Sequence, residues 1–330
     1  MSLRPLTVAV ALFWALDKGV AAQGDRSYLA LLDSYAGGQV IEAVDALSAW
    51  PQARVRAAVR SLDERAALAR ARTALILHTE TAFREPADGR EPFHVEVARS
   101  FLGRVLNETA DVGGKRIKPS PQARDLAARW HALLGILYCV RDDDRRTLLA
   151  ISQGLALDSK HKDVHLVEGA RSERIRDLSR ATMSYRGILS DHPDFLEARL
   201  RLGWVLHAAS SRDSQERSRE LLEDVAARTE RPDLLYLGHL FLGSVHERAN
   251  RPSEAAREYE AALAAMPMQS AVIGLIRVET ALGHDDRARA LTADIPAADS
   301  PGTFDLWHSY NRCFTSGALV EGLRAEAQRP

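Results

Sequence analysis

The sequence predicts an all-α protein folded as an α-solenoid of stacked antiparallel helical hairpins. Apolar residues recur three and four positions apart along almost all of the 330 residues, and no long stretch alternates with period two. Gly135, Gly169 and Gly203 lie 34 residues apart, Gly243 follows after 40, and each falls within a helical pattern. Because glycine inside a helix costs about 1 kcal/mol relative to alanine, this spacing indicates positions where a neighbouring helix leaves no room for a side chain.

The first 22 residues have the features of a signal peptide. Arg4 supplies a positive charge, Leu6 to Leu16 form an apolar run, and small residues precede Gln23. The run has eleven residues, whereas a membrane-spanning helix needs about 20. We therefore expect cleavage after Ala22 and a periplasmic or secreted protein without a membrane span. The alternative is that this segment is a buried first helix.

Three further segments follow. Residues 23–118 are expected to form an N-terminal helical region that includes a degenerate hairpin at 27–51. A stretch rich in glycine and proline at 110–121 marks the boundary before the repeat array at 119–298. Residues 299–330 are expected to form a C-terminal capping segment, with apolar positions at Phe304, Leu306, Trp307 and Leu323.

Composition and cysteine content narrow the classes of protein. Hydrophobic residues make up 46% and charged residues 27%, which is typical of a globular chain. The formal net charge of −1 gives a weak long-range field, so no nucleic-acid partner is expected. A bridge between Cys139 and Cys313, 174 positions apart, would have to join distant repeats, so the sequence predicts buried free thiols.

The residues around the spaced glycines are similar to those of the tetratricopeptide-repeat (TPR) family. The best-matching unit carries Leu242-Gly243, Ala255, Tyr259, Ala262 and Pro267 at the spacing of that family. The unit at 163–193 keeps Gly169, Ala181, Tyr185 and Pro193, with Glu168 where leucine is expected. Weaker units surround Gly135 and Gly203 and cover 269–296. The resemblance implies hairpins that bury their apolar stripes against neighbours in one continuous core.

The resemblance also implies a non-catalytic scaffold that binds a protein or peptide and needs no cofactor. In TPR arrays the first helix of each hairpin lines the concave face, and that face is apolar here along its middle with mainly acidic edges. We therefore expect a partner with an apolar anchor and basic residues. Trp204 is the expected contact for that anchor; the alternative is that it packs against a neighbouring repeat. Carried over in register, the groove residues are Arg129, Ile136, Asp163, Leu166, Glu173, Glu197, Leu200, Trp204, His207, Leu240 and Glu247.

A second hypothesis is a cell-envelope hydrolase with its site in the N-terminal helical region. The dense acid–base cluster there consists of Glu80, Glu85, His94 and Glu96. Exposed charges on a pair of helices explain these residues equally well. An enzyme requires a deep pocket with convergent titratable groups, whereas a scaffold requires an open groove.

Three local patterns have both a chemical and a structural interpretation. His161 and His165 share one helix face and could bind a metal, or could lie in solvent at a helix start. The run Gly113 to Arg116 resembles a phosphate-binding loop but lacks its spacing, which favours a linker. Asp142 to Asp144 are expected to cap a helix rather than bind a cation.

Overall fold

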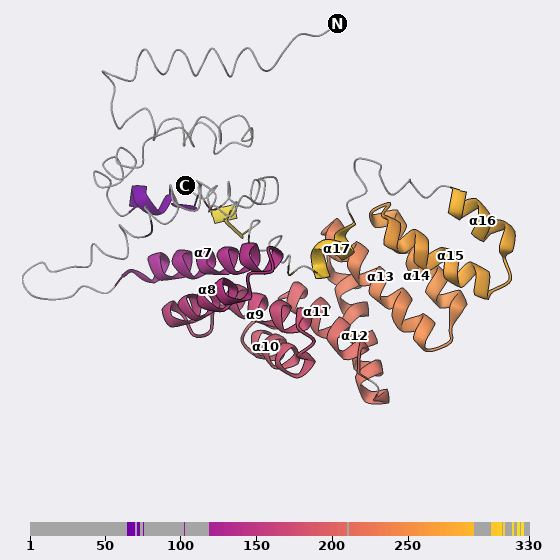
Figure 1. Ribbon diagram of the computed structural model, residues 1–330, viewed down its shortest axis with the longest axis horizontal. Helices are drawn as coiled ribbons and strands as arrows, with labels where there is room; N and C mark the ends of the chain where they lie inside the picture. Colours follow the sequence, from indigo (N-terminus) through magenta and orange to yellow (C-terminus); the bar gives the residue numbers. More distant parts are fainter. Residues whose placement is uncertain are drawn as a thin grey trace, which may run out of the picture. The chain divides into compact units, whose positions relative to one another are not determined.

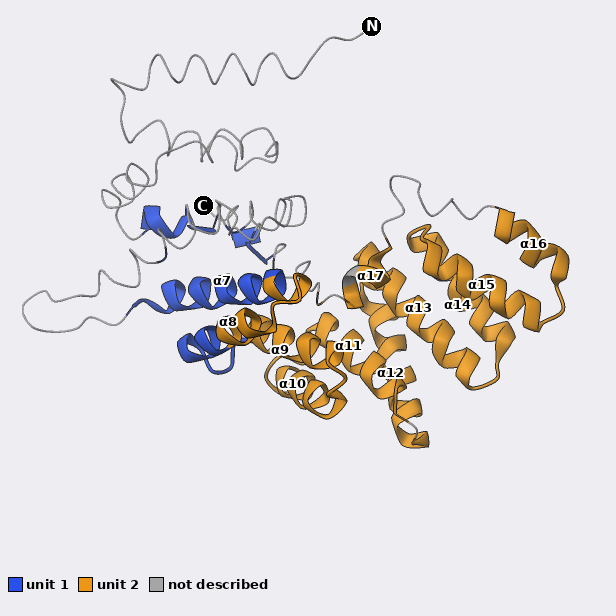
Figure 2. Ribbon diagram, in the orientation of Figure 1, with its two compact units in different colours: residues 1–137, 152–161, 316–330 blue, residues 138–151, 162–315 orange. Residues whose placement is uncertain are grey.

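The computed structural model describes residues 119–209, 211–293 and 305–311. It also describes residues 65–69, 71, 72, 75, 319, 322, 323, 325 and 326, together with Leu102 and Cys313. The chain divides into two compact units (Figure 2). Unit 1 contains residues 1–137, 152–161 and 316–330, and unit 2 contains residues 138–151 and 162–315.

The described part of unit 1 is built around the first seventeen residues of α7 (Pro121–Val140). This helix buries Ala123, Leu126 and Ala127 on one side. Its Arg129 pairs with Asp125 at 2.9 Å one turn earlier, and at 2.7 Å with Glu326 from the C-terminal piece. The ion pair with Glu326 joins segments that are far apart in the sequence.

Unit 2 contains four consecutive helical hairpins and a short final helix, which are coloured from magenta to yellow in Figure 1. The end of α7 and the first half of α8 (Asp144–Leu157) precede them. Neighbouring helices pack in chain order throughout. The hairpins are α9 (Lys162–Arg174) with α10 (Leu178–Asp191), α11 (Leu196–His207) with α12 (Arg212–Arg228), α13 (Pro232–Arg248) with α14 (Pro252–Ala265), and α15 (Gln269–Ala281) with α16 (Asp285–Ala293). The final helix is α17 (Leu306–Asn311).

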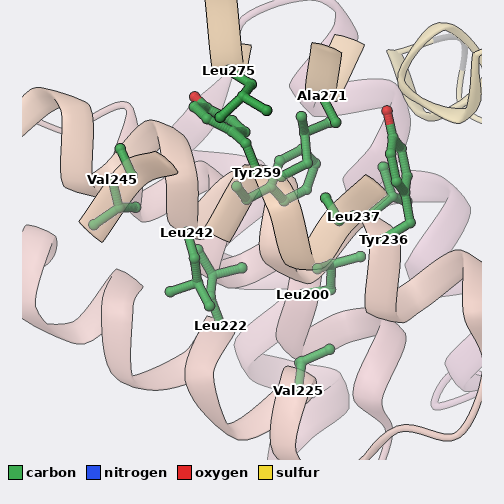
Figure 3. Close-up of a cluster of buried hydrophobic side chains, with 14 of the residues drawn as sticks. Leu200, Leu222, Val225, Tyr236, Leu237, Leu242, Val245, Tyr259, Ala271 and Leu275 are labelled. Atoms are coloured by element: carbon green, nitrogen blue, oxygen red, sulfur yellow. The ribbon is translucent and has the colours of Figure 1, made fainter. Parts of the chain in front are cut away.

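The first helices of the hairpins form one layer of unit 2. Successive members of the set α9, α11, α13 and α15 contact each other, and each also contacts its own second helix. The apolar core lies between these helices and the second helices, as Figure 3 shows around Leu222, Leu242 and Tyr259. This arrangement confirms the predicted all-α solenoid of stacked hairpins.

Three of the four spaced glycines, Gly169, Gly203 and Gly243, lie where the two helices of a hairpin meet. A Cβ atom at Gly169 would lie 2.6 Å from Cζ of Tyr185, and one at Gly243 would lie 2.5 Å from Cε1 of Tyr259. At Gly203 the nearest atoms belong to Leu222, at 2.9 Å. The expected close approach is therefore confirmed, and in two hairpins the group filling the space is the tyrosine sixteen positions later.

The aspartates at 142–144 include a helix cap, as expected. Asp143 Oδ1 accepts a hydrogen bond of 3.0 Å from the backbone N–H of Arg146, in the first turn of α8. Asp144 instead accepts two hydrogen bonds from Arg171 of α9, at 2.6 and 2.7 Å. Capping and an ion pair between helices therefore account for both carboxylates.

The prediction of free thiols is wrong, because Cys139 and Cys313 form a disulfide. The prediction assumed that residues 174 positions apart lie in distant repeats. However, α17 packs back onto the layer of first helices, where it contacts α13. Cys313 follows that helix and meets Cys139 beside Ala170, in a small buried cluster.

Candidate protein-binding site

The C-terminal helix α17 lies on the first helices through its aromatic residues. Trp307 packs edge-on against Trp204 and Phe241, with ring centroids 5.0 and 5.4 Å apart. Tyr310, one turn later, packs edge-on against Phe241 at 5.1 Å and stacks with Trp307 at 5.6 Å. Such aromatic pairs contribute about 0.5–1.5 kcal/mol beyond the area they bury. We call the surface made by Ala170, Glu173, Trp204, Phe241 and Ser244 the first-helix face.

Asp305 holds the start of α17 in place. Its Oδ2 accepts a hydrogen bond of 2.6 Å from the backbone N–H of Ser270, and its Oδ1 accepts one of 2.9 Å from the N–H of Trp307. The hydroxyl of Tyr236 donates to Oδ1 at 3.3 Å. One carboxylate thus caps α17 and joins it to α13 and α15.

Glu173 anchors the other end of the helix. The hydroxyl of Tyr310 donates to Glu173 Oε2 at 2.9 Å, and Arg201 Nη1 donates to Oε1 at 3.1 Å. Tyr185, from the second helix of the same hairpin, also donates to Oε1. The Arg201 guanidinium carbon lies 4.1 Å from the centre of the Tyr310 ring, within cation–π range. Burial and the neighbouring Glu173 charge raise the pKa of Tyr310, so this phenol stays protonated and donates.

A second carboxylate with similar surroundings lies two hairpins later. Glu247 accepts a hydrogen bond from Tyr259 and a bidentate pair from Arg277, whose Nε lies 2.6 Å from Oε1. Burial acts to raise the pKa of Glu247, but the hydrogen bonds from Arg277 and Tyr259 outweigh it and lower that pKa. This carboxylate is therefore ionised at neutral pH.

An open pocket of about 220 Å³ lies between this second cluster and α17. Its lining combines aromatic rings with two serines and one arginine. Ile273 of α15, at its edge, is 45% exposed. The lining residues come from α11, α13, α14, α15 and α17, and are Trp204, Leu240, Phe241, Ser244, Tyr259, Ser270, Ile273, Arg277 and Trp307.

One serine of the pocket contacts a histidine. His207 Nε2 lies 3.1 Å from Ser244 Oγ, and burial lowers the pKa of His207 to about 4. A nucleophilic serine also needs a group that orients the histidine and donors for an oxyanion. In the described ranges no carboxylate bonds to Nδ1 of His207. The backbone N–H groups around Ser244, in the middle of α13, are used within the helix.

The structure separates the eleven residues predicted to line the groove. Glu173, Trp204 and Glu247 are partly exposed. Glu173 bonds to Tyr310 of α17, Trp204 and Leu240 line the pocket, and Glu247 bonds to the pocket residues Tyr259 and Arg277. Arg129 and Ile136 belong to unit 1, where Ile136 is buried. The remaining members are buried in unit 2, and are Asp163, Leu166, Glu197, Leu200 and His207.

The carboxylates expected to attract basic residues of a partner are already paired with arginines or buried. Glu173 and Glu247 are bonded to Arg201 and Arg277. Glu197 is buried, and this burial raises its pKa to about 7. The exposed chemistry of the pocket is therefore aromatic, with one guanidinium.

Several other residues that the sequence singles out fall outside the described residues. This is the case for Glu80, Glu85, His94 and Glu96, and for the glycine-rich run at 113–116. His161 contacts Asp125 at 3.2 Å, whereas His165 contacts Glu168 at 3.1 Å. Among the residues that the structure describes, no group of three or more potential ligands is placed to hold a metal ion. None of the described helices is long and apolar enough to cross a bilayer.

Sequence reasoning missed the residues that complete the site. Trp307 and Tyr310 had a usable signal, since two aromatic residues three apart on a short helix share one face. Arg277 and Ile273 lie in the last hairpin, whose register was not assigned. Arg201 lies in a helix of mixed composition, with no local sign that it would contact an aromatic ring.

Comparisons with known proteins place the likeness at the level of fold. No family model matches the sequence, and no curated protein matches it. Similar solved structures include TTC0263, a TPR protein of Thermus thermophilus, at 17% identity and a TM-score of 0.46, covering 56% of this chain and 98% of that one. PilW, a widely conserved type IV pilus biogenesis factor, has 21% identity and a TM-score of 0.47, covering 61% and 92%. A TPR protein from Parabacteroides merdae has 14% identity and a TM-score of 0.44, covering 78% and 99%. The packing of unit 2 itself, with Tyr185 against Gly169 and Tyr259 against Gly243, agrees with the TPR-like pattern of the sequence.

Proposed function

We propose that this protein is a non-catalytic scaffold that binds a segment of a partner protein on the first-helix face of unit 2. The single observation that carries the proposal is the position of α17. This short helix packs Trp307 and Tyr310 on residues of α9, α11 and α13, so the face already binds an aromatic helix of its own chain. A helix lying on an apolar face is one of the recurring modes of peptide recognition.

The open part of this face is the pocket beside α17. Trp204, Phe241 and Trp307 form its aromatic side, and aromatic residues are enriched among binding hot spots. The partner should therefore present an apolar, aromatic anchor. That the partner also carries basic residues beside this anchor stays a prediction. Glu173 and Glu247, the carboxylates that would attract such residues, are already bonded to arginines.

We also propose that the protein acts outside the cytoplasm, after cleavage behind Ala22. The Cys139–Cys313 disulfide supports this location, because disulfides form and persist mainly in oxidising compartments. N-terminal sequencing of protein isolated from its native host tests the cleavage. A mature chain that starts at Met1 or Ser2 would contradict it.

Partner capture with matched variants tests the function. Ile273→Asp places a charge at the rim of the pocket, and Met183→Asp places the same charge on α10, where the side chain is 73% exposed. Each tagged full-length protein is used to capture partners from an extracytoplasmic extract. Mass spectrometry then identifies the captured proteins. We expect a partner that wild type and Met183→Asp retain and Ile273→Asp loses. Partners common to all three proteins would contradict binding at this face.

A further inference from the structure

We propose that the pocket lined by Tyr259 and Arg277 binds a tyrosine side chain of the partner, with the ring stacked on Arg277 and the phenol hydroxyl on Glu247, the carboxylate to which both of these residues are bonded. The inference rests on the proposed function and names the side chain that the site recognises. It follows from comparing the two carboxylate clusters of unit 2, of which one already holds a tyrosine.

The two clusters are built in the same way. Each carboxylate lies four positions after a packing glycine, and each accepts a hydrogen bond from the tyrosine twelve positions later in the second helix. Each also pairs with an arginine from the next first helix, 28 residues on for Glu173 and 30 residues on for Glu247. The clusters therefore offer similar charge and donor groups to an incoming side chain.

The clusters differ in the group that completes them. At Glu173 the hydroxyl of Tyr310 donates to the free oxygen, while Arg201 lies over its ring. At Glu247 no further hydroxyl is bonded among the described residues. An ionised carboxylate has about four acceptor positions, so Glu247 can accept one more hydrogen bond besides those from Tyr259 and Arg277.

The space beside Glu247 fits a phenol ring. The pocket of about 220 Å³ exceeds the volume of about 150 Å³ that suffices for benzene in an engineered cavity. Arg277 lines it and its side chain is 59% exposed, so a face of the guanidinium is available for stacking. Trp204 and Trp307 line the pocket and offer aromatic surface like that which Phe241, edge-on, and Trp307, stacked, present to Tyr310.

The hydroxyl should make the site selective. A carboxylate that the incoming ring shields from water favours tyrosine over phenylalanine, because phenylalanine fills the same space and leaves the acceptor unbonded. A hydrogen bond to a charged group is stronger than one between two neutral groups. We therefore expect the site to prefer tyrosine over phenylalanine by about tenfold or more.

A titration of the full-length protein with two amino-acid amides tests the proposal. The probes are N-acetyl-tyrosinamide and N-acetyl-phenylalaninamide, and the signal is the methyl resonance of Ile273 in isotope-labelled protein. We expect saturation of the Ile273 shift at about tenfold lower concentration of the tyrosine probe. Equal affinity for the two probes, or no shift with either, overturns the proposal.

Variants separate this site from the function on which it rests. Arg277→Met and Glu247→Gln should bring the two probes to similar affinity, whereas Arg217→Met, an exposed position on α12, should keep the preference. A preference that survives both pocket variants overturns the hydroxyl site. If Glu247→Gln fails to fold, the exposed Arg277→Met carries the test. If Ile273→Asp loses the partner while the wild type binds the two probes with equal affinity, the tyrosine site is refuted. The proposed binding face would still be supported by that result.

Discussion

Alanine in place of Gly243 tests the packing on which the hairpin register depends. A Cβ atom there would lie 2.5 to 2.8 Å from three atoms of the Tyr259 ring. The ring cannot retreat toward α15, because a Cβ atom at Gly274 would lie 2.6 Å from the same ring on its other side. Overpacking of this kind costs about 1–3 kcal/mol, while replacing a helical glycine by alanine returns about 1 kcal/mol.

Gly187→Ala is the matched control. Gly187 lies in α10, and a Cβ atom there meets nothing within 4 Å. This variant should therefore gain up to about 1 kcal/mol from helix propensity alone. The free energies of unfolding of Gly187→Ala and Gly243→Ala should differ by about 1–3 kcal/mol, which is the packing cost isolated from propensity.

Urea unfolding followed by far-UV circular dichroism measures this difference. In a Tyr259→Leu background the cost at Gly243 should shrink, because the group that occupies the space is gone, and a double-mutant cycle gives the coupling. Equal free energies for the two alanine variants would refute the reasoning and with it the register of α13 on α14.

Three further predictions concern α17 and a buried carboxyl group. Cys139→Ser should lower the Tm, because losing a disulfide costs about 2–4 kcal/mol, and a thiol reductant should lower the Tm of the wild type only; a wild-type Tm that is insensitive to reductant would contradict the crosslink. Tyr310→Phe should lower the free energy of unfolding by about 1.5–3 kcal/mol, because it removes a hydrogen bond to the charged Glu173; unchanged urea unfolding would place this hydroxyl elsewhere. Burial raises the pKa of Glu197 from 4.5 to about 7, so the stability that its proton confers is complete below pH 4.5 and is lost as the pH rises through 7. Glu197→Gln should therefore match the wild type near pH 4 and exceed its stability at pH 8 by up to about 3 kcal/mol. Comparing the two proteins at each pH removes the effect of His207, whose lowered pKa acts in the opposite direction; parallel stability curves would contradict the shift.

The hairpins of unit 2 could be predicted because their signals are local and repeated. The spacing from Gly169 to Tyr185 and from Gly243 to Tyr259 is the same, and both pairs are in contact in the structure. Each signal spans one hairpin, so a single sequence contains it in full. The same register predicted Trp204 on the groove side; in the structure its ring stacks on Phe241 of the next hairpin at 4.3 Å, and its role as a contact for a partner stays a prediction.

The C-terminal half of the candidate site could not be predicted, because its contacts join positions without a local pattern. Tyr310 bonds to Glu173 across 137 positions. A short helix outside the repeat can cap the array or cover a face, and its composition is the same in both cases. The error over Cys139 and Cys313 has the same origin, since it followed from treating sequence separation as distance.

The disulfide also determines how the chain carries mechanical load. The residues from Cys139 to Cys313, which include every hairpin from α9 to α16, form a closed covalent ring. When the two ends of the chain are pulled, tension passes directly through the sulfur–sulfur bond. The hairpins inside the ring then carry no load and keep their binding face while the rest of the chain extends. Only after reduction would the same pull unstack them.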